Sequence, residues 1–424
     1  MTNSSSCSSS VANQANVVLA RPVGIPPIRI TRVKTVVVRN VPSGGGLIRP
    51  WDPNKIPLNT RDYVVVQFLT NAGLIGTAMD GDSELSEDYG AIIDKKAQYF
   101  VGKDPFEIEV HNRDFFQAEA QNEYTFGLGK IPPRLFFLEI GLWDIIGKAL
   151  NQPLYRLWGA ARDKVQAYAA TVHFGKSPEE RAEDALAFYE KGFRALKLRL
   201  HHMNPEDDLK LVATVIKAVG GKMKVMADAN MGGTKPGDPP PAWSFQVAER
   251  MALALQDLGL YWLEEPLPVH DYEGMARVCR QLKSMYLAGG EGNIGLAQFR
   301  EVLRHGSLSY IQPDPMIGGP VSVIRKIAAM GEGFGVKFGP HHGKSGVGMM
   351  INLHMQCAAP NSGYIEYMYD PGFRNPAGFQ AGFAELIPID PEGYVHVPDL
   401  PGLGVPWDPE FCRKYGLEYQ SLTA

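Results

Sequence analysis

The chain has 424 residues, of which 45% are hydrophobic, and this is enough for a large buried core and more than one domain. Its formal net charge of −4 gives no indication of a nucleic acid or an anionic membrane as partner, so we expect a small-molecule partner. The four cysteines show no C-x-x-C spacing, which argues against a zinc knuckle and a disulfide framework and favours reduced thiols in a cytoplasmic protein. No apolar run approaches the roughly 20 residues of a membrane span.

Residues 1–26 are rich in serine and asparagine, and no basic residue precedes their weak apolar patch. This order of charge and apolar residues is wrong for a secretory signal, and the composition predicts a disordered tail.

Residues 27–160 predict an N-terminal α+β capping domain. Apolar and alternating runs at 28–42 and 62–81 indicate antiparallel strands, and helical patterns follow at 86–102 and 132–154. The Gly/Pro-rich stretch between the strands is unusually long for a loop, which predicts a lid. We expect Arg49 and Trp51 on this lid to contact the distal part of a ligand.

From residue 161 to 369 short strands alternate with helical patterns, which predicts a parallel sheet. About eight such units favour a closed barrel over an open sheet. The predicted strands are "VQAYAAT", "ALKLRL", "KVMADA", "YWLEEP", "MYLAGGE", "YIQPD", "VKFGPH" and "YIEYM".

Ionisable residues end six successive strands of this predicted barrel, from the third to the eighth: Asp228, Glu264 with Glu265, Glu291, Asp314, His341 with His342, and Glu366. The carboxyl ends of barrel strands meet at one mouth, where active sites are found. Three carboxylates on neighbouring strands would repel one another, and a divalent cation bound by oxygen ligands, Mg²⁺, resolves this. Taken singly, each acid has an ordinary explanation as a helix cap, and Glu265 as an outward-facing salt-bridge partner.

The succession "LKLRL", "VMADAN", "WLEEPL", "AGGE", "IQPDPMIGGP" and "FGPHH" resembles the enolase superfamily, mandelate racemase subgroup, over nearly the whole chain after the tail. The resemblance implies a modified TIM barrel, (β/α)7β, with segment 370–424 returning to the capping domain. It also implies a residue for each role in the site: Mg²⁺ ligands Asp228, Glu264 and Glu291, general base His341 with its orienting partner Asp314, and Lys197 and Glu366 at the substrate carboxylate.

These residue types suit removal of a proton α to a carboxylate, which would otherwise place two charges on one small group. A metal ion and a lysine stabilise the enediolate as it forms. A neutral histidine accepts the proton near pH 7 when a buried aspartate fixes its tautomer.

Arg199 departs from the Lys-x-Lys that many members of the subgroup carry on this strand. Because arginine stays protonated, it is a poor base and a good carboxylate donor. One credible base favours β-elimination of water from a sugar acid, and racemisation of a 2-hydroxy acid is the alternative. We also expect Asn230 and His201 to contact the substrate.

Two other classes of protein stay open. A metal-dependent hydrolase on a similar barrel would need a His-x-His pair on the first strand, and that region contains His173 alone. A barrel that only binds ligands would not need the complete set of metal and base residues. We expect a homo-oligomer that acts on a small carboxylate.

Overall fold

The computed structural model describes residues 27–42, 60–82, 85–86, 88–118, 135–172, 175–235, 237–238 and 241–419. The predicted tail and the lid residues Arg49 and Trp51 lie outside these described residues. Within the described ranges, no helix is both long and apolar enough to cross a membrane.

The N-terminal region is built on an antiparallel sheet with the strand order β13-β1-β2-β3. Its predicted strands are confirmed as β1 (Ile30–Pro42), β2 (Thr60–Thr70) and β3 (Ile75–Asp82). The last strand, β13 (Gly416–Tyr419), pairs with β1, so the end of the chain joins the first strand.

Helices cover this sheet and connect it to the barrel. They are α1 (Tyr89–Ala97), η1 (Gln98–Phe100), α2 (Ile108–His111), η2 (Asn112–Phe116), α4 (Leu138–Ala149) and α5 (Leu154–Leu157). Helix α4 approaches β3 so closely that a Cβ on Gly76 would lie 2.0 Å from the carbonyl oxygen of Gly141. The carboxylate of Glu139 on α4 accepts hydrogen bonds from Ser322 N and Oγ at 2.7 and 2.8 Å.

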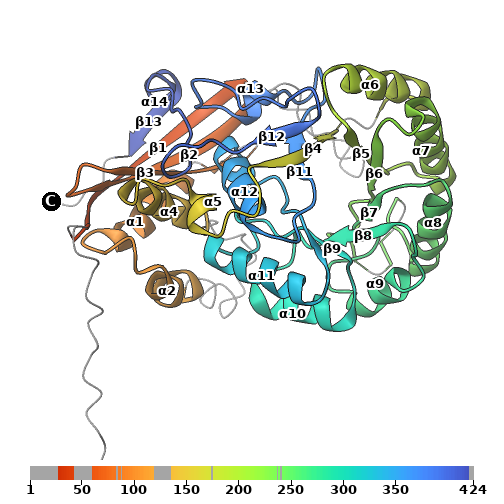
Figure 1. The fold of residues 1–424 in the computed structure, drawn as a ribbon, viewed down its shortest axis with the longest axis horizontal. Coiled ribbons are helices and arrows are strands. Elements are labelled where there is room, and N and C mark those ends of the chain that lie inside the picture. Colours follow the sequence, from red (N-terminus) through yellow and green to blue (C-terminus); the bar gives the residue numbers. More distant parts are fainter. Residues whose placement is uncertain are drawn as a thin grey trace, which may run out of the picture.

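Eight parallel strands form the barrel, and each predicted strand is confirmed: β4 (Lys164–Ala170), β5 (Ala195–Arg199), β6 (Lys224–Asp228), β7 (Trp262–Glu264), β8 (Tyr286–Gly289), β9 (Tyr310–Ile311), β10 (Lys337–Phe338) and β11 (Ile365–Met368). A parallel bridge between Phe338 and Ser362 closes the barrel between its last two strands. The modified TIM barrel with an N-terminal capping domain is therefore confirmed (Figure 1).

One helix follows each of the first seven barrel strands, and these helices surround the sheet in Figure 1: α6 (Pro178–Glu190), α7 (Pro205–Val219), α8 (Phe245–Asp257), α9 (Tyr272–Cys279), α10 (Gly295–His305), α11 (Val321–Gly333) and α12 (Gly346–Ala358). Local sequence sets their ends. Ser177 and Glu180 form a reciprocal capping box at the start of α6, and Gly220 ends α7 with a φ of +55°.

After the barrel, the chain forms α13 (Pro376–Phe379), β12 (Tyr394–His396) and α14 (Phe411–Tyr415). Strand β12 pairs antiparallel with β4. The interior of the barrel is filled by aromatic rings, with Trp262 5.1 Å from Tyr168 and 4.8 Å from Tyr310 between ring centroids. This packed floor leaves the carboxyl ends of the strands as the place for a site.

Candidate active site

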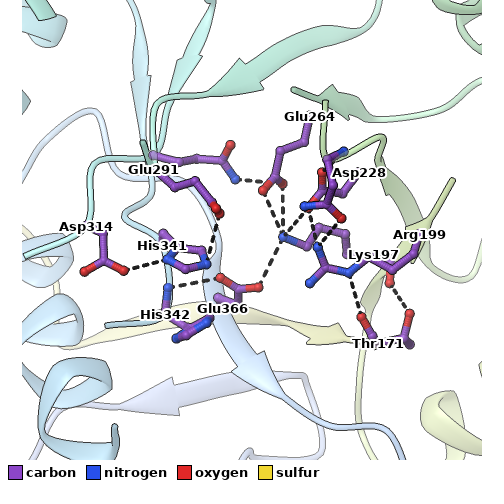
Figure 2. Close-up of polar contacts among 12 residues, drawn as sticks. Thr171, Lys197, Arg199, Asp228, Glu264, Glu291, Asp314, His341, His342 and Glu366 are labelled. Carbon is purple, nitrogen blue, oxygen red and sulfur yellow. Dashed lines mark hydrogen bonds and ion pairs between the residues drawn. The ribbon is translucent and has the colours of Figure 1, made fainter. Parts of the chain in front are cut away.

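Lys197 lies at the centre of a charged cluster at the barrel mouth (Figure 2). Its side chain is fully buried, and Nζ lies 3.0 Å from Glu264 Oε1, 3.2 Å from Glu366 Oε1 and 3.6 Å from Asp228 Oδ2. Burial alone would lower the pKa of Lys197, but Glu264 and Glu366 outweigh it and raise the pKa. The lysine therefore carries a permanent positive charge.

Arg199, two residues further on the same strand, neutralises Asp228. Its Nη1 donates to Asp228 Oδ2 and, at 3.0 Å, to Asn230 Oδ1, while Nε donates to the carbonyl oxygen of Thr171 at 2.9 Å. Burial would raise the pKa of Asp228, but Arg199 and then Lys197 lower it. This side of the site holds fixed charges.

His341 lies on the other side, between two carboxylates. Its Nδ1 is 2.5 Å from Asp314 Oδ2 and its Nε2 is 3.0 Å from Glu291 Oε2. Burial lowers the pKa of His341, but Glu291, Asp314 and Glu366 outweigh it and raise the pKa to about 9. In this arrangement the neighbouring carboxylates therefore favour the protonated imidazole.

Asp228, Glu264 and Glu291 do not surround a common point in this arrangement. Among the described residues, no three His, Cys, Asp or Glu side chains are gathered closely enough to hold a metal ion. Lys197 lies between the first two carboxylates, and Glu291 faces His341. The expectation that three carboxylates face one another is therefore not met by these side-chain positions.

The chemistry of these donors nevertheless fits Mg²⁺. All three are carboxylates, which supply the oxygen ligands that this ion prefers. Burial, followed by the charge of Asp228, raises the pKa of Glu264 to about 7, so Lys197 does not fully compensate the negative charge there. A further cation would compensate the remaining negative charge and stabilise the ionised form of Glu264.

Residues 180–411 match the family model described as enolase C-terminal domain-like, which is more than half of the chain. The chain belongs to the enolase superfamily, in its mandelate racemase/muconate lactonizing enzyme subgroup. It is 31% identical to an arabinonate dehydratase of Saccharolobus solfataricus over 63% of this chain and 68% of that protein. It is 27% identical to a D-xylonate dehydratase of Haloferax volcanii over 85% and 87% of the two chains.

Among solved structures, a racemase from Streptomyces coelicolor with bound magnesium has a TM-score of 0.76 and 25% identity, covering 92% of this chain and 100% of that one. The relatives of this enolase superfamily member thus include both sugar-acid dehydratases and a racemase.

Glu366, Asn230 and His201, three further predicted residues of this superfamily member, lie at the same mouth. Glu366 Oε2 accepts a hydrogen bond from the His342 backbone at 3.0 Å. Asn230 donates to Asp228 Oδ2 at 2.9 Å. His201 is 6% exposed, and burial lowers its pKa to about 3.

The structure corrects the outward-facing explanation of Glu265. Its side chain is 5% exposed, and its φ of +44° belongs to the left-handed region. Its carboxyl group packs so closely on Gly232 that a Cβ there would lie 2.5 Å away. Glu265 therefore points inward, beside the predicted metal ligand Glu264.

Gln312 is a site residue that had no predicted role. Its Nε2 donates to Glu264 Oε2 at 2.9 Å and so helps to orient that carboxylate. The signal was present in the predicted strand "YIQPD", where Gln312 precedes Asp314 by two residues, and alternation along a strand would place the two side chains on one face.

Proposed function

We propose that this protein is a Mg²⁺-dependent dehydratase of sugar acids, which removes the proton α to the carboxylate and eliminates the β-hydroxyl as water. The observation that supports the proposal most is the difference in charge between the two sides of the site at the barrel mouth. His341, a titratable group held by Asp314, lies on one side of the site, and the fixed positive charges of Lys197 and Arg199 lie on the other (Figure 2). The dehydratase names of the two sequence relatives also support this reaction class.

Lys197 and Arg199 bind and orient the substrate carboxylate in this proposal. Both cations keep their charge throughout the reaction, so they stabilise the second negative charge that the carboxylate gains when the proton leaves. Mg²⁺, which Asp228, Glu264 and Glu291 would hold, supplies further charge stabilisation when bound. Glu366 keeps Lys197 in place through their 3.2 Å contact.

His341 then carries the proton between two atoms. Neutral Nε2 takes the α-proton, and the resulting imidazolium returns a proton to the departing β-hydroxyl, which leaves as water. Asp314 fixes the ring by accepting from Nδ1. The negative charge of Glu291 is the largest of the attractions that raise the pKa of His341. If the charge of Glu291 is neutralised, this pKa falls, which favours the neutral imidazole that the first step needs.

Racemisation needs a second base on the opposite face of the α-carbon. Arg199 is the candidate for this role, because it stands where many members of the subgroup carry the second lysine of Lys-x-Lys. Burial works against its charge, but Asp228, Glu366 and Glu264 raise its pKa above the ordinary value for arginine. A guanidinium held in this way does not accept a proton. The geometry therefore favours elimination.

The test is to incubate the protein with Mg²⁺ and a panel of sugar acids in D₂O and to follow both the α-hydrogen and the product by NMR. We expect loss of water, with a 2-oxo acid as product after tautomerisation. Interconversion of epimers without loss of water would replace this proposal with racemisation.

A further inference from the structure

Two buried arginines, Arg61 and Arg374, form no ion pair with a carboxylate of the described residues. Arg61 begins strand β2 of the capping sheet, Arg374 lies in the turn after β11, and each is 6% exposed. Among the described residues, neither guanidinium forms an ion pair, and the Nε of each is buried without a hydrogen-bond partner.

Arg61 is tied to the catalytic side of the barrel. Its Nη2 donates to the carbonyl oxygens of Gly81 at 3.3 Å and Lys344 at 3.1 Å. The Lys344 backbone donates in turn to His342 Nδ1 at 2.8 Å, and the rings of His342 and His341 are 4.0 Å apart. Carbonyl oxygens satisfy donors, but they leave the charge of Arg61 uncompensated.

Arg374 is held from the opposite side. Its backbone pairs with that of Asp370, whose Oδ2 accepts from the Val172 backbone at the end of the first barrel strand. The neighbouring Thr171 carbonyl accepts from Arg199. Both arginines are therefore connected to site residues, Arg61 through the backbone of Lys344 and Arg374 through Asp370 and the segment that contains Thr171.

The electrostatics show that the two guanidiniums act on each other and on the site. Burial, followed by the charge of Arg61, lowers the pKa of Arg374 to about 10, and Arg199 contributes to the same shift, while Tyr63 and Asp82 oppose it without cancelling it. The pKa of His342 is lowered well below its ordinary value by burial and by His341, with smaller contributions from Lys344, Arg61 and Arg374. Burying two like charges together is costly unless an anion joins them.

We propose that Arg61 and Arg374 bind a second carboxylate of the substrate, at the end remote from the reacting carbon, so that the preferred substrates are sugar dicarboxylates. The inference rests on the proposed function and narrows it to a substrate class. Guanidinium groups suit this role because their planar donors match the two oxygens of a carboxylate. A neutral hydroxymethyl group at that end would leave both charges unpaired.

The direct test compares pairs of sugar acids that differ only in the far group, which is a carboxylate in the aldarate and a hydroxymethyl in the aldonate. We expect the parent protein to prefer the aldarate in kcat/KM. Arg374→Met should lower the aldarate to aldonate ratio about 10- to 100-fold, because a charge-assisted hydrogen bond is lost. Arg374→Lys keeps the positive charge but loses the planar pair of guanidinium donors, so it should recover part of the preference for the aldarate.

Arg325→Met is the matched control. Arg325 is half-buried on α11 and lies over the Trp158 ring at 4.6 Å, and it also lacks an ion pair among the described residues. Its replacement should leave the ratio unchanged. Without ligand, Arg374→Met should not lower the thermal unfolding temperature, because an unpaired buried charge has been removed. A clear loss of stability together with an unchanged ratio would assign Arg374 a structural role and overturn the inference.

A binding measurement separates this inference from the proposed function. Calorimetry with glutarate and its monomethyl ester, in the presence of Mg²⁺, reports the second carboxylate without any turnover. Tighter glutarate binding that is lost in Arg61→Met and Arg374→Met supports the inference even if no sugar acid is dehydrated. Equal affinity for the two compounds in the parent protein, or a preference that survives in both variants, overturns it. Using both variants keeps the test decisive if one of them does not fold.

Discussion

On the β5–β7 side of the barrel mouth, Asp228 and Glu264 are paired with Lys197 and Arg199, whereas on the β8–β10 side Glu291 and Asp314 flank His341. The first side carries cations that keep their charge at any ordinary pH. The second contains a group that gains and loses a proton. In the proposed function, this difference assigns substrate binding to the first side and proton transfer to the second.

The largest expected effect comes from removing the carboxylates that would hold Mg²⁺. Asp228→Asn, Glu264→Gln and Glu291→Gln should each lower turnover about 10⁴-fold or more, because charge stabilisation of the enediolate is lost. Circular dichroism should show an intact fold, and calorimetry should show weakened Mg²⁺ binding. Activity retained in any two of the three would remove the metal assignment.

His341→Asn tests the side that changes its protonation. It should lower both α-proton exchange and product formation about 10²- to 10⁴-fold, the usual range for a general base. The control is His202→Asn. His202 lies on the loop before α7, and its ring pairs with Asp208 of that helix. Exchange at near the parent rate in His341→Asn would show that another residue takes the proton.

Arg199→Lys tests the side with fixed charge and should have a smaller effect. We expect His341-dependent exchange to continue, with KM raised about 10-fold because the planar fork is lost. The new lysine introduces a titratable group on the opposite face, so slow epimerisation should accompany dehydration. NMR in D₂O measures both, and loss of all exchange in this variant would contradict the division between the two sides.

Glu139 extends the comparison to a buried carboxylate that has hydrogen bonds from Ser322 and no neighbouring cation at ion-pair distance among the described residues. Burial raises the pKa of Glu139 from 4.5 to about 7. The folded state therefore prefers the protonated form, and this contribution to stability is complete below about pH 4.5 and is lost as pH rises through about 7.

Glu139→Gln cannot ionise, so its stability relative to the parent should increase between pH 5 and 8, by at most about 3 kcal/mol. Denaturant unfolding at several pH values measures this difference. Glu392→Gln is the control, because Glu392 is an exposed partner of Lys164. A difference between Glu139→Gln and the parent that stays constant with pH would show that Glu139 remains ionised in the folded protein.

Much of the fold was predictable because local signals agreed with one another. Eight short apolar runs alternate with helical patterns. This alternation and the number of units together indicate a barrel. The pairing of His341 with Asp314 was implied by the resemblance to the enolase superfamily, and the two side chains are in contact because the ends of neighbouring strands meet. The confirmed strands carry most of the described residues of the predicted site at or just after their carboxyl ends, while the roles given to these residues stay predictions.

What the sequence by itself determined is the order of strands and the residue types at their ends, because both depend on local periodicity. Only the tertiary structure decided how the charges are shared. Glu265 faces inward because its backbone turns at a positive φ, and Lys197 reaches three carboxylates because strands β6, β7 and β11 converge on it. Arg61 and Arg374 are far apart in the chain, and each alone has the sequence signature of an ordinary surface arginine. The charge of Arg61 acts on Arg374 because the capping sheet packs against the barrel, and no pattern along the chain records proximity of that range.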